Sequence, residues 1–298
     1  MRSAQRFAKE HPFLFAILAT VVWILVMGVA AAIAAWALHT PMADPLPQSL
    51  GMLAATACLL GVMGRWGWLR AAGIPRLGTW RLWLVTVGLA VYVVIAYQMA
   101  FFRGIALDIS SLWASGGAQS ILMRQAVVGV AEETLFRGFQ LFVLVRAWGD
   151  SRRGLLAAVA VPALIFGLTH APQVLAGNPM DDTLMTMLNC TVSGLWWGAL
   201  VLMGGSIWPA VLLHAVSNAS FQITALGLCG YNATVTEFVA ATAAELPLVI
   251  GGLWLVLRKV PGFDPDPRSR AGRKSIGFCM EERRDASDAL AVRYSLAE

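Results

Sequence analysis

Residues 127–140 read VVGVAEETLFRGFQ, and they place Glu132, Glu133 and Arg137 within an otherwise apolar helical segment. A charged side chain at the centre of a bilayer costs about 2.5–3.5 kcal/mol on insertion scales, so each one is a candidate functional group. Glu133 and Arg137 stand four residues apart, a spacing that brings side chains together on one helical face. We therefore expect an ion pair between them. Glu132 points about 100° away around the helix axis and is the candidate general base.

Apolar segments of about 16 to 26 residues lie on both sides of this stretch, separated by short polar or Pro- and Gly-rich connections. That length is enough to cross about 30 Å of hydrocarbon. The chain is 58% hydrophobic and 13% charged, whereas a soluble domain is about 25% charged. These features predict an all-α polytopic membrane protein with about eight transmembrane helices, of which four form the catalytic core. The predicted helices are 13–38, 49–64, 83–102, 119–148, 154–175, 181–204, 207–227 and 237–258.

The arginines and lysines gather at the ends of alternate apolar segments, which predicts a cell-membrane protein with both termini in the cytoplasm. Their placement also accounts for the formal net charge of +5, so we expect a lipid bilayer and no nucleic acid as a partner. The chain is predicted to form a single integral membrane domain over residues 1–260, with its motif-bearing core at about 119–225. Residues 261–298 are polar with nearly balanced charge, and are expected to form a disordered cytoplasmic tail.

Two histidines lie inside the later apolar segments. His170 ends the run Phe166-Gly-Leu-Thr-His170, and His214 begins the run His214-Ala-Val-Ser-Asn218, in which imidazole and carboxamide share one helical face. Three helices can therefore point Glu132, His170, His214 and Asn218 into one cavity. A carboxylate with a histidine can take a proton from water, and a second histidine with an asparagine can donate hydrogen bonds to an oxyanion. This set supports amide hydrolysis without a serine or cysteine nucleophile.

The ordered set of these three motifs on successive helices resembles the CPBP family, which contains CAAX prenyl endopeptidases of the Ras-converting type and bacteriocin-processing or immunity proteins. The resemblance implies that Glu132 activates water together with His170. It implies that His214 and Asn218 stabilise the oxyanion. The supporting residues are Glu133, Arg137 and Phe166.

Members of that family are described as glutamic, metal-independent proteases, so no cofactor is expected. From the residues alone, Glu132, His170 and His214 would also form a zinc set with an open fourth position, which keeps zinc as an alternative. The four cysteines show no metal-ligand spacing. Glu245, which lies in another apolar segment without a partner motif, is interpreted as a packing or near-interface group.

The sequence therefore predicts an intramembrane endopeptidase that cleaves near the C-terminus or leader of a small or membrane-anchored protein. Two alternatives stay open: a non-catalytic immunity or interaction protein, and a proton-coupled transporter. The predicted boundaries place His170 near the outer end of its span and His214 nearer the cytoplasmic end of its own. A displaced start of the 154–175 helix, or a kink at Pro162, would bring His170 deeper.

Overall fold

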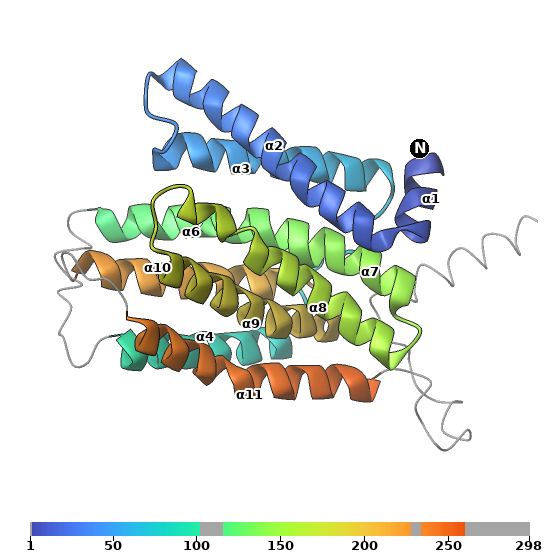
Figure 1. Ribbon diagram of the computed structural model, residues 1–298. Helices are drawn as coiled ribbons and strands as arrows, with labels where there is room; N and C mark the ends of the chain where they lie inside the picture. The colour runs from blue at the N-terminus through green and yellow to red at the C-terminus, as the bar shows by residue number, and fades with distance from the viewer. Residues whose placement is uncertain (1, 102–115, 228–233, 260–298) are drawn as a thin grey trace, which may run out of the picture.

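A computed structural model describes residues 2–101, 116–227 and 234–259, and within these ranges every regular element is helical (Figure 1). The predicted tail, 261–298, lies outside the described residues. In chain order the elements are α1 (Arg2–Glu10), α2 (Pro12–Leu38), α3 (Pro45–Arg65), α4 (Trp80–Phe101), α6 (Gly117–Glu133), the π-helix η1 (Thr134–Gln140), α7 (Leu141–Trp148), α8 (Arg152–Leu168), the 3₁₀ turn η2 (Ala171–Val174), α9 (Met180–Gly204), α10 (Trp208–Gly227) and α11 (Val235–Lys259).

Six stretches of the described chain form helices long and apolar enough to cross a membrane. They belong to α2, α3, α4, α9, α11 and the stretch from α8 to η2. The continuous rod of α6, η1 and α7 and the helix α10 are not among the six, and these two carry most of the polar motif residues. The prediction of an all-α polytopic membrane protein is confirmed.

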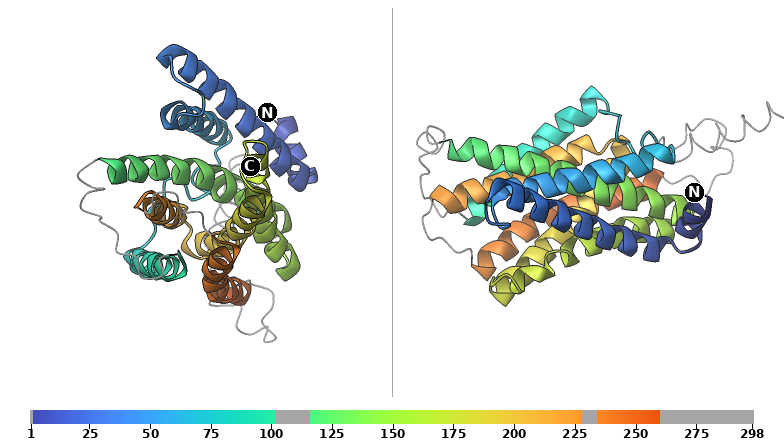
Figure 2. Two further views of the ribbon diagram at one scale, coloured as in Figure 1. Left: turned by 60° about the vertical axis from the view of Figure 1, so that its left-hand side comes forward. Right: turned by 90° about the horizontal axis from the view of Figure 1, so that it is seen from above.

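The helices form a bundle in which α6, α8, α9 and α10 occupy the middle (Figure 1). The hairpin of α2 and α3 covers one side, and α4 and α11 cover the opposite side, as the turned view also shows (Figure 2). A polar contact ties the hairpin to the central rod, because Gln140 Nε2 donates to Thr20 Oγ1 at 2.6 Å. The motif-bearing helices are thus shielded from lipid on two sides.

Close approach between the central helices depends on small residues, as is common in membrane bundles. A Cβ added at Gly129 would lie 2.9 Å from the carbonyl oxygen of Val211, so the backbones of α6 and α10 meet at this glycine. A Cβ at Gly167 would collide with Thr191 Oγ1, so α8 and α9 meet in the same way. The first contact brings together the helices that carry Glu132 and His214, and the second packs α8, which precedes His170, against α9.

The predicted helix 154–175 is wrong at its end, because α8 stops at Leu168. His170 follows the helix and precedes the short turn η2. Pro162 lies inside α8 and is buried. Both histidines lie beside Phe166, despite the predicted mismatch in depth. The ring of Phe166 lies 5.3 Å from that of His170 and 5.6 Å from that of His214, measured between centroids.

A second buried carboxylate, Glu245 on α11, joins three helices. Its Oε1 accepts a hydrogen bond from the Tyr97 hydroxyl at 2.7 Å, and its Oε2 accepts from Ser193 Oγ at 2.6 Å and Trp196 Nε1 at 2.8 Å. The side chain is 1% exposed. Glu245 is therefore a packing group, as the sequence suggests, but one with a complete set of donors from α4 and α9.

Replacing Glu245 with leucine should lower the free energy of unfolding by about 1–3 kcal/mol, because the buried Trp196 and Ser193 donors lose their acceptor. Glu245→Gln is the matched control, since its amide oxygen can still accept from Trp196 and its NH₂ can donate to the hydroxyls. Reversible unfolding in mixed detergent micelles would measure both variants. Equal stability of the leucine and glutamine variants would show that the hydrogen bonds do not hold the helices.

Candidate active site

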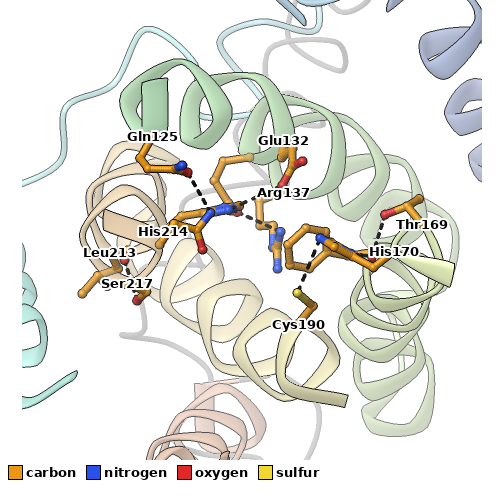
Figure 3. A network of polar contacts seen from close by, with 12 residues as sticks. Gln125, Glu132, Arg137, Thr169, His170, Cys190, Leu213, His214 and Ser217 are labelled. Carbon is orange, nitrogen blue, oxygen red and sulfur yellow. Dashed lines mark hydrogen bonds and ion pairs between the residues drawn. The ribbon is translucent and has the colours of Figure 1, made fainter. Parts of the chain in front are cut away.

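Three fully buried side chains from α6, η1 and α10 form the centre of the site (Figure 3). Arg137 Nη1 donates to Oε1 of Glu133 at 2.9 Å, and His214 Nδ1 lies 2.8 Å from the same oxygen. The pair expected from the i, i+4 spacing is therefore present. In addition, the Glu133 carboxylate contacts His214 on α10, a helix that is distant in the sequence.

This contact fixes how His214 is presented. An ionised carboxylate can only accept hydrogen bonds, so Nδ1 of His214 must carry a proton. The other ring nitrogen, Nε2, then points to Glu132, whose Oε2 lies 3.5 Å away. The Glu132 side chain is 17% exposed, whereas Glu133 is 0% exposed. Of the two adjacent carboxylates, Glu132 is the one that a water molecule or a substrate can approach.

His170 lies across the ring of Phe166 from His214. Its Nδ1 is 3.0 Å from the carbonyl oxygen of Phe166, so Nδ1 carries a proton, and in the neutral ring Nε2 is then an acceptor. That Nε2 lies 3.7 Å from Sγ of Cys190 on α9. Figure 3 shows the Arg137 side chain between His214 and His170. Glu132 has its direct contact with His214, and a Glu132–His170 partnership would operate through a water or substrate between them.

Asn218 stands one turn after His214 on α10 and faces α6. Its Nδ2 donates to Oε1 of Gln125 at 3.1 Å. Gln125 precedes Glu132 by seven residues, two helical turns, and so lies on the same face of α6. The sequence contains the signal for Gln125, a polar residue at helical spacing from the motif, but sequence reasoning did not identify it.

Aromatic rings enclose the buried guanidinium. Arg137 Cζ lies 4.7 Å from the ring centroid of Phe166 and 5.2 Å from that of Trp197, at which distances cation–π attraction operates. Trp197 also stacks on His214, with centroids 4.8 Å apart and planes at 25°. A Cβ at Gly194 would lie 2.9 Å from both Arg137 Nη2 and Ala163 Cβ, so this glycine lets α9 approach the guanidinium and α8 closely. Phe166 supports the site as expected; Trp197 and Gly194 were not foreseen.

A π-helix begins directly after the glutamate pair. The N–H of Leu141 donates to the carbonyl of Phe136, five residues earlier, and all seven residues of η1 are buried. Single π turns inside α-helices occur frequently at functional sites. The sequence predicted one regular helix over 119–148, and the extra residue in the turn changes which side chains after Glu133 face the core.

A zinc ion in a catalytic site is usually held by three protein side chains. Among the described residues, no group of three or more histidine, cysteine, aspartate or glutamate side chains is arranged to hold a metal ion. Glu132 and His214 instead contact each other directly. The proposed zinc alternative therefore has to be tested by chelation.

Comparison with known proteins gives one informative match. Residues 113–220 match a family model described as type II CAAX prenyl endopeptidase Rce1-like. The match confirms the resemblance drawn from the motifs, and the matched residues include Glu132, His170, His214 and Asn218. No curated protein and no solved structure matches the chain. Together with the apolar helices, the matched family indicates a multi-pass membrane protein of the membrane endopeptidase class.

Proposed function

We propose that this protein is an intramembrane endopeptidase that hydrolyses a peptide bond near the C-terminus or leader of a small or membrane-anchored protein. The observation that carries the proposal is His214, which contacts both glutamates and is held by the buried Glu133–Arg137 pair. A binding protein would not require a histidine fixed between two carboxylates. The family match supports the same class of reaction.

In the proposed reaction, Glu132 takes one proton from a water molecule, and Nε2 of His170 accepts a hydrogen bond from the same water molecule. The water oxygen attacks the carbonyl carbon of the scissile bond and gives a tetrahedral oxyanion. The oxyanion accepts hydrogen bonds from Nε2–H of His214, in its imidazolium form, and from Nδ2–H of Asn218. The C–N bond then breaks, and the proton held by Glu132 passes to the leaving amine.

The structure supports a specific role for Glu133 in this scheme. Its carboxylate is neutralised by Arg137 and accepts from Nδ1–H of His214, so it sets the orientation of the imidazole. A third group that orients a histidine is the usual arrangement in hydrolytic sites. Glu133 and Arg137 are thus positioning residues, and Glu132 is the base.

We propose further that both termini are cytoplasmic, that the protein acts in the cell membrane and that it needs no cofactor. The substrate is a peptide or a membrane-anchored protein; a prenylated C-terminus, a bacteriocin leader and a C-terminal sorting segment are the three forms to compare.

The test is hydrolysis by the purified full-length protein in detergent, with product masses as the readout. The peptides are a prenylated C-terminal peptide, the same peptide without its prenyl group, a bacteriocin leader peptide and a C-terminal sorting segment, each with and without a chelator. We expect cleavage of at least one peptide and no change on chelation. Loss of activity on chelation would favour the zinc alternative. Binding without cleavage would favour an interaction protein, and proton flux into proteoliposomes a transporter.

The contact between Cys190 and His170 offers a different nucleophile, because a thiol beside a histidine is the arrangement of cysteine hydrolases. With water as the nucleophile, Cys190→Ser should keep hydrolysis within about threefold of wild type, as serine can also bond to Nε2 of His170. The exposed Cys58 on α3 supplies the control variant, Cys58→Ser. A loss of more than about 100-fold for Cys190→Ser alone would make Cys190 the nucleophile.

A further inference from the structure

The hydrogen bond between Gln125 and Asn218 is separate from the contacts that join Glu133 to Arg137 and His214. Gln125 is 2% exposed and accepts from Asn218 Nδ2 at 3.1 Å. The two residues lie on the same α6–α10 seam as Glu133 and His214, and the close approach at Gly129 lies between the two contacts. The seam thus has one polar bond on each side of its tightest point.

A free carboxamide can present either its NH₂ or its oxygen toward a substrate, since a rotation of 180° exchanges them. Only the NH₂ can donate to an oxyanion. The hydrogen bond from one N–H of Asn218 to Gln125 Oε1 places the NH₂ group of Asn218 at the contact between α6 and α10. The second N–H of the same nitrogen can then donate to a substrate. In this structure the Gln125 oxygen faces Asn218, and the resulting orientation of the Asn218 carboxamide is the one that the proposed reaction needs.

We propose that Gln125 is a positioning residue that holds the Asn218 carboxamide with an N–H directed at the developing oxyanion. This inference rests on the proposed function and specifies how one of its donors is set in place. Gln125 itself need not touch the substrate. Its effect should therefore appear in kcat, which reports stabilisation that is stronger in the transition state, and not in KM.

The alternative is that the pair acts as interhelical glue, which polar residues commonly provide in membrane bundles. Glue and positioning differ in one measurable way. Loss of glue should lower the free energy of unfolding together with kcat. Loss of positioning should lower kcat while the free energy of unfolding, measured on the same preparations, stays near that of wild type, and it has no further effect once the Asn218 carboxamide has been removed.

The experiment compares Gln125→Met, Gln125→Glu, Asn218→Ala and the double variant Gln125→Met with Asn218→Ala, all in the full-length protein. Methionine is similar in shape and lacks the acceptor, whereas glutamate keeps an acceptor oxygen. We expect Gln125→Met to lower kcat about tenfold with KM within twofold, and Gln125→Glu to retain most of kcat. In the Asn218→Ala background, Gln125→Met should change kcat by less than twofold.

An equal loss of kcat from Gln125→Met in both backgrounds would overturn the proposal, as would an equal loss for the glutamate and methionine variants. Wild-type kcat for Asn218→Ala would overturn it as well, while leaving water activation by Glu132 standing. If the wild-type protein cleaved none of the peptides, the proposed function itself would fail. Should Gln125→Met not fold, Gln125→Ala removes the same acceptor and gives the same comparison.

Discussion

Replacing Glu132 with glutamine should lower the rate of peptide hydrolysis by about 10²–10⁴-fold, the contribution typical of a general base. Glutamine has nearly the same shape but cannot take a proton from water. The fold should tolerate the change, because Glu132 is partly exposed and its contact to His214 is 3.5 Å long. The measurement is the single-turnover rate of peptide cleavage, together with the unfolding temperature of the same preparation.

Glu133→Gln, at the adjacent residue, is the variant to compare with Glu132→Gln. Glu133 is fully buried and accepts from both Arg137 and His214, so loss of its charge should lower stability as well as rate. Glu132→Gln should instead lose rate with little change in unfolding temperature. Glu132→Asp keeps a carboxylate on a shorter side chain and should retain part of the activity. Hydrolysis at the wild-type rate by Glu132→Gln would exclude Glu132 as the base.

The parts of the fold that were predicted correctly depend on local sequence. Long apolar segments between polar connections predict the helices, because the chain must satisfy its backbone hydrogen bonds within the bilayer. The Glu133–Arg137 contact was predicted for the same reason, since residues four apart on a helix meet without help from any other element. The end of α8 was predicted too late, although Pro172, four residues after Leu168, is a sequence signal for a helix end.

The parts of the site that were missed depend on contacts between helices. That His214 bonds to Glu133 as well as facing Glu132 follows from the depth at which α10 packs on α6, which Gly129 controls. Trp197 on α9 stacks on His214 on α10, a contact that depends on how these two helices pack. Helical spacing alone cannot specify either distance. The π-helix likewise has no sequence signature among residues 134–140.

Replacing Arg137 with methionine should lower the free energy of unfolding by about 3–5 kcal/mol, the cost of leaving a buried charge without its partner. Glu133 would keep His214 as a partner but would lose the guanidinium at 2.9 Å. Hydrolysis should fall at least tenfold in the same variant, because the carboxylate that orients His214 would no longer be neutralised. Reversible unfolding in mixed micelles and peptide cleavage would measure the two effects. Arg65→Met, at an exposed position in the last turn of α3, is the control.

The double variant Glu133→Gln with Arg137→Met distinguishes an unpaired charge from lost packing. It removes both charges, while the glutamine oxygen can still accept from Nδ1–H of His214. If the unpaired carboxylate causes the loss, the double variant should recover more than half of the stability lost by Arg137→Met. If the guanidinium acts mainly by filling the space among Phe166, Trp197 and Gly194, the double variant should be no more stable than the single one. A stability of Arg137→Met within about 0.5 kcal/mol of wild type would contradict both explanations, since surface substitutions alone stay within that range.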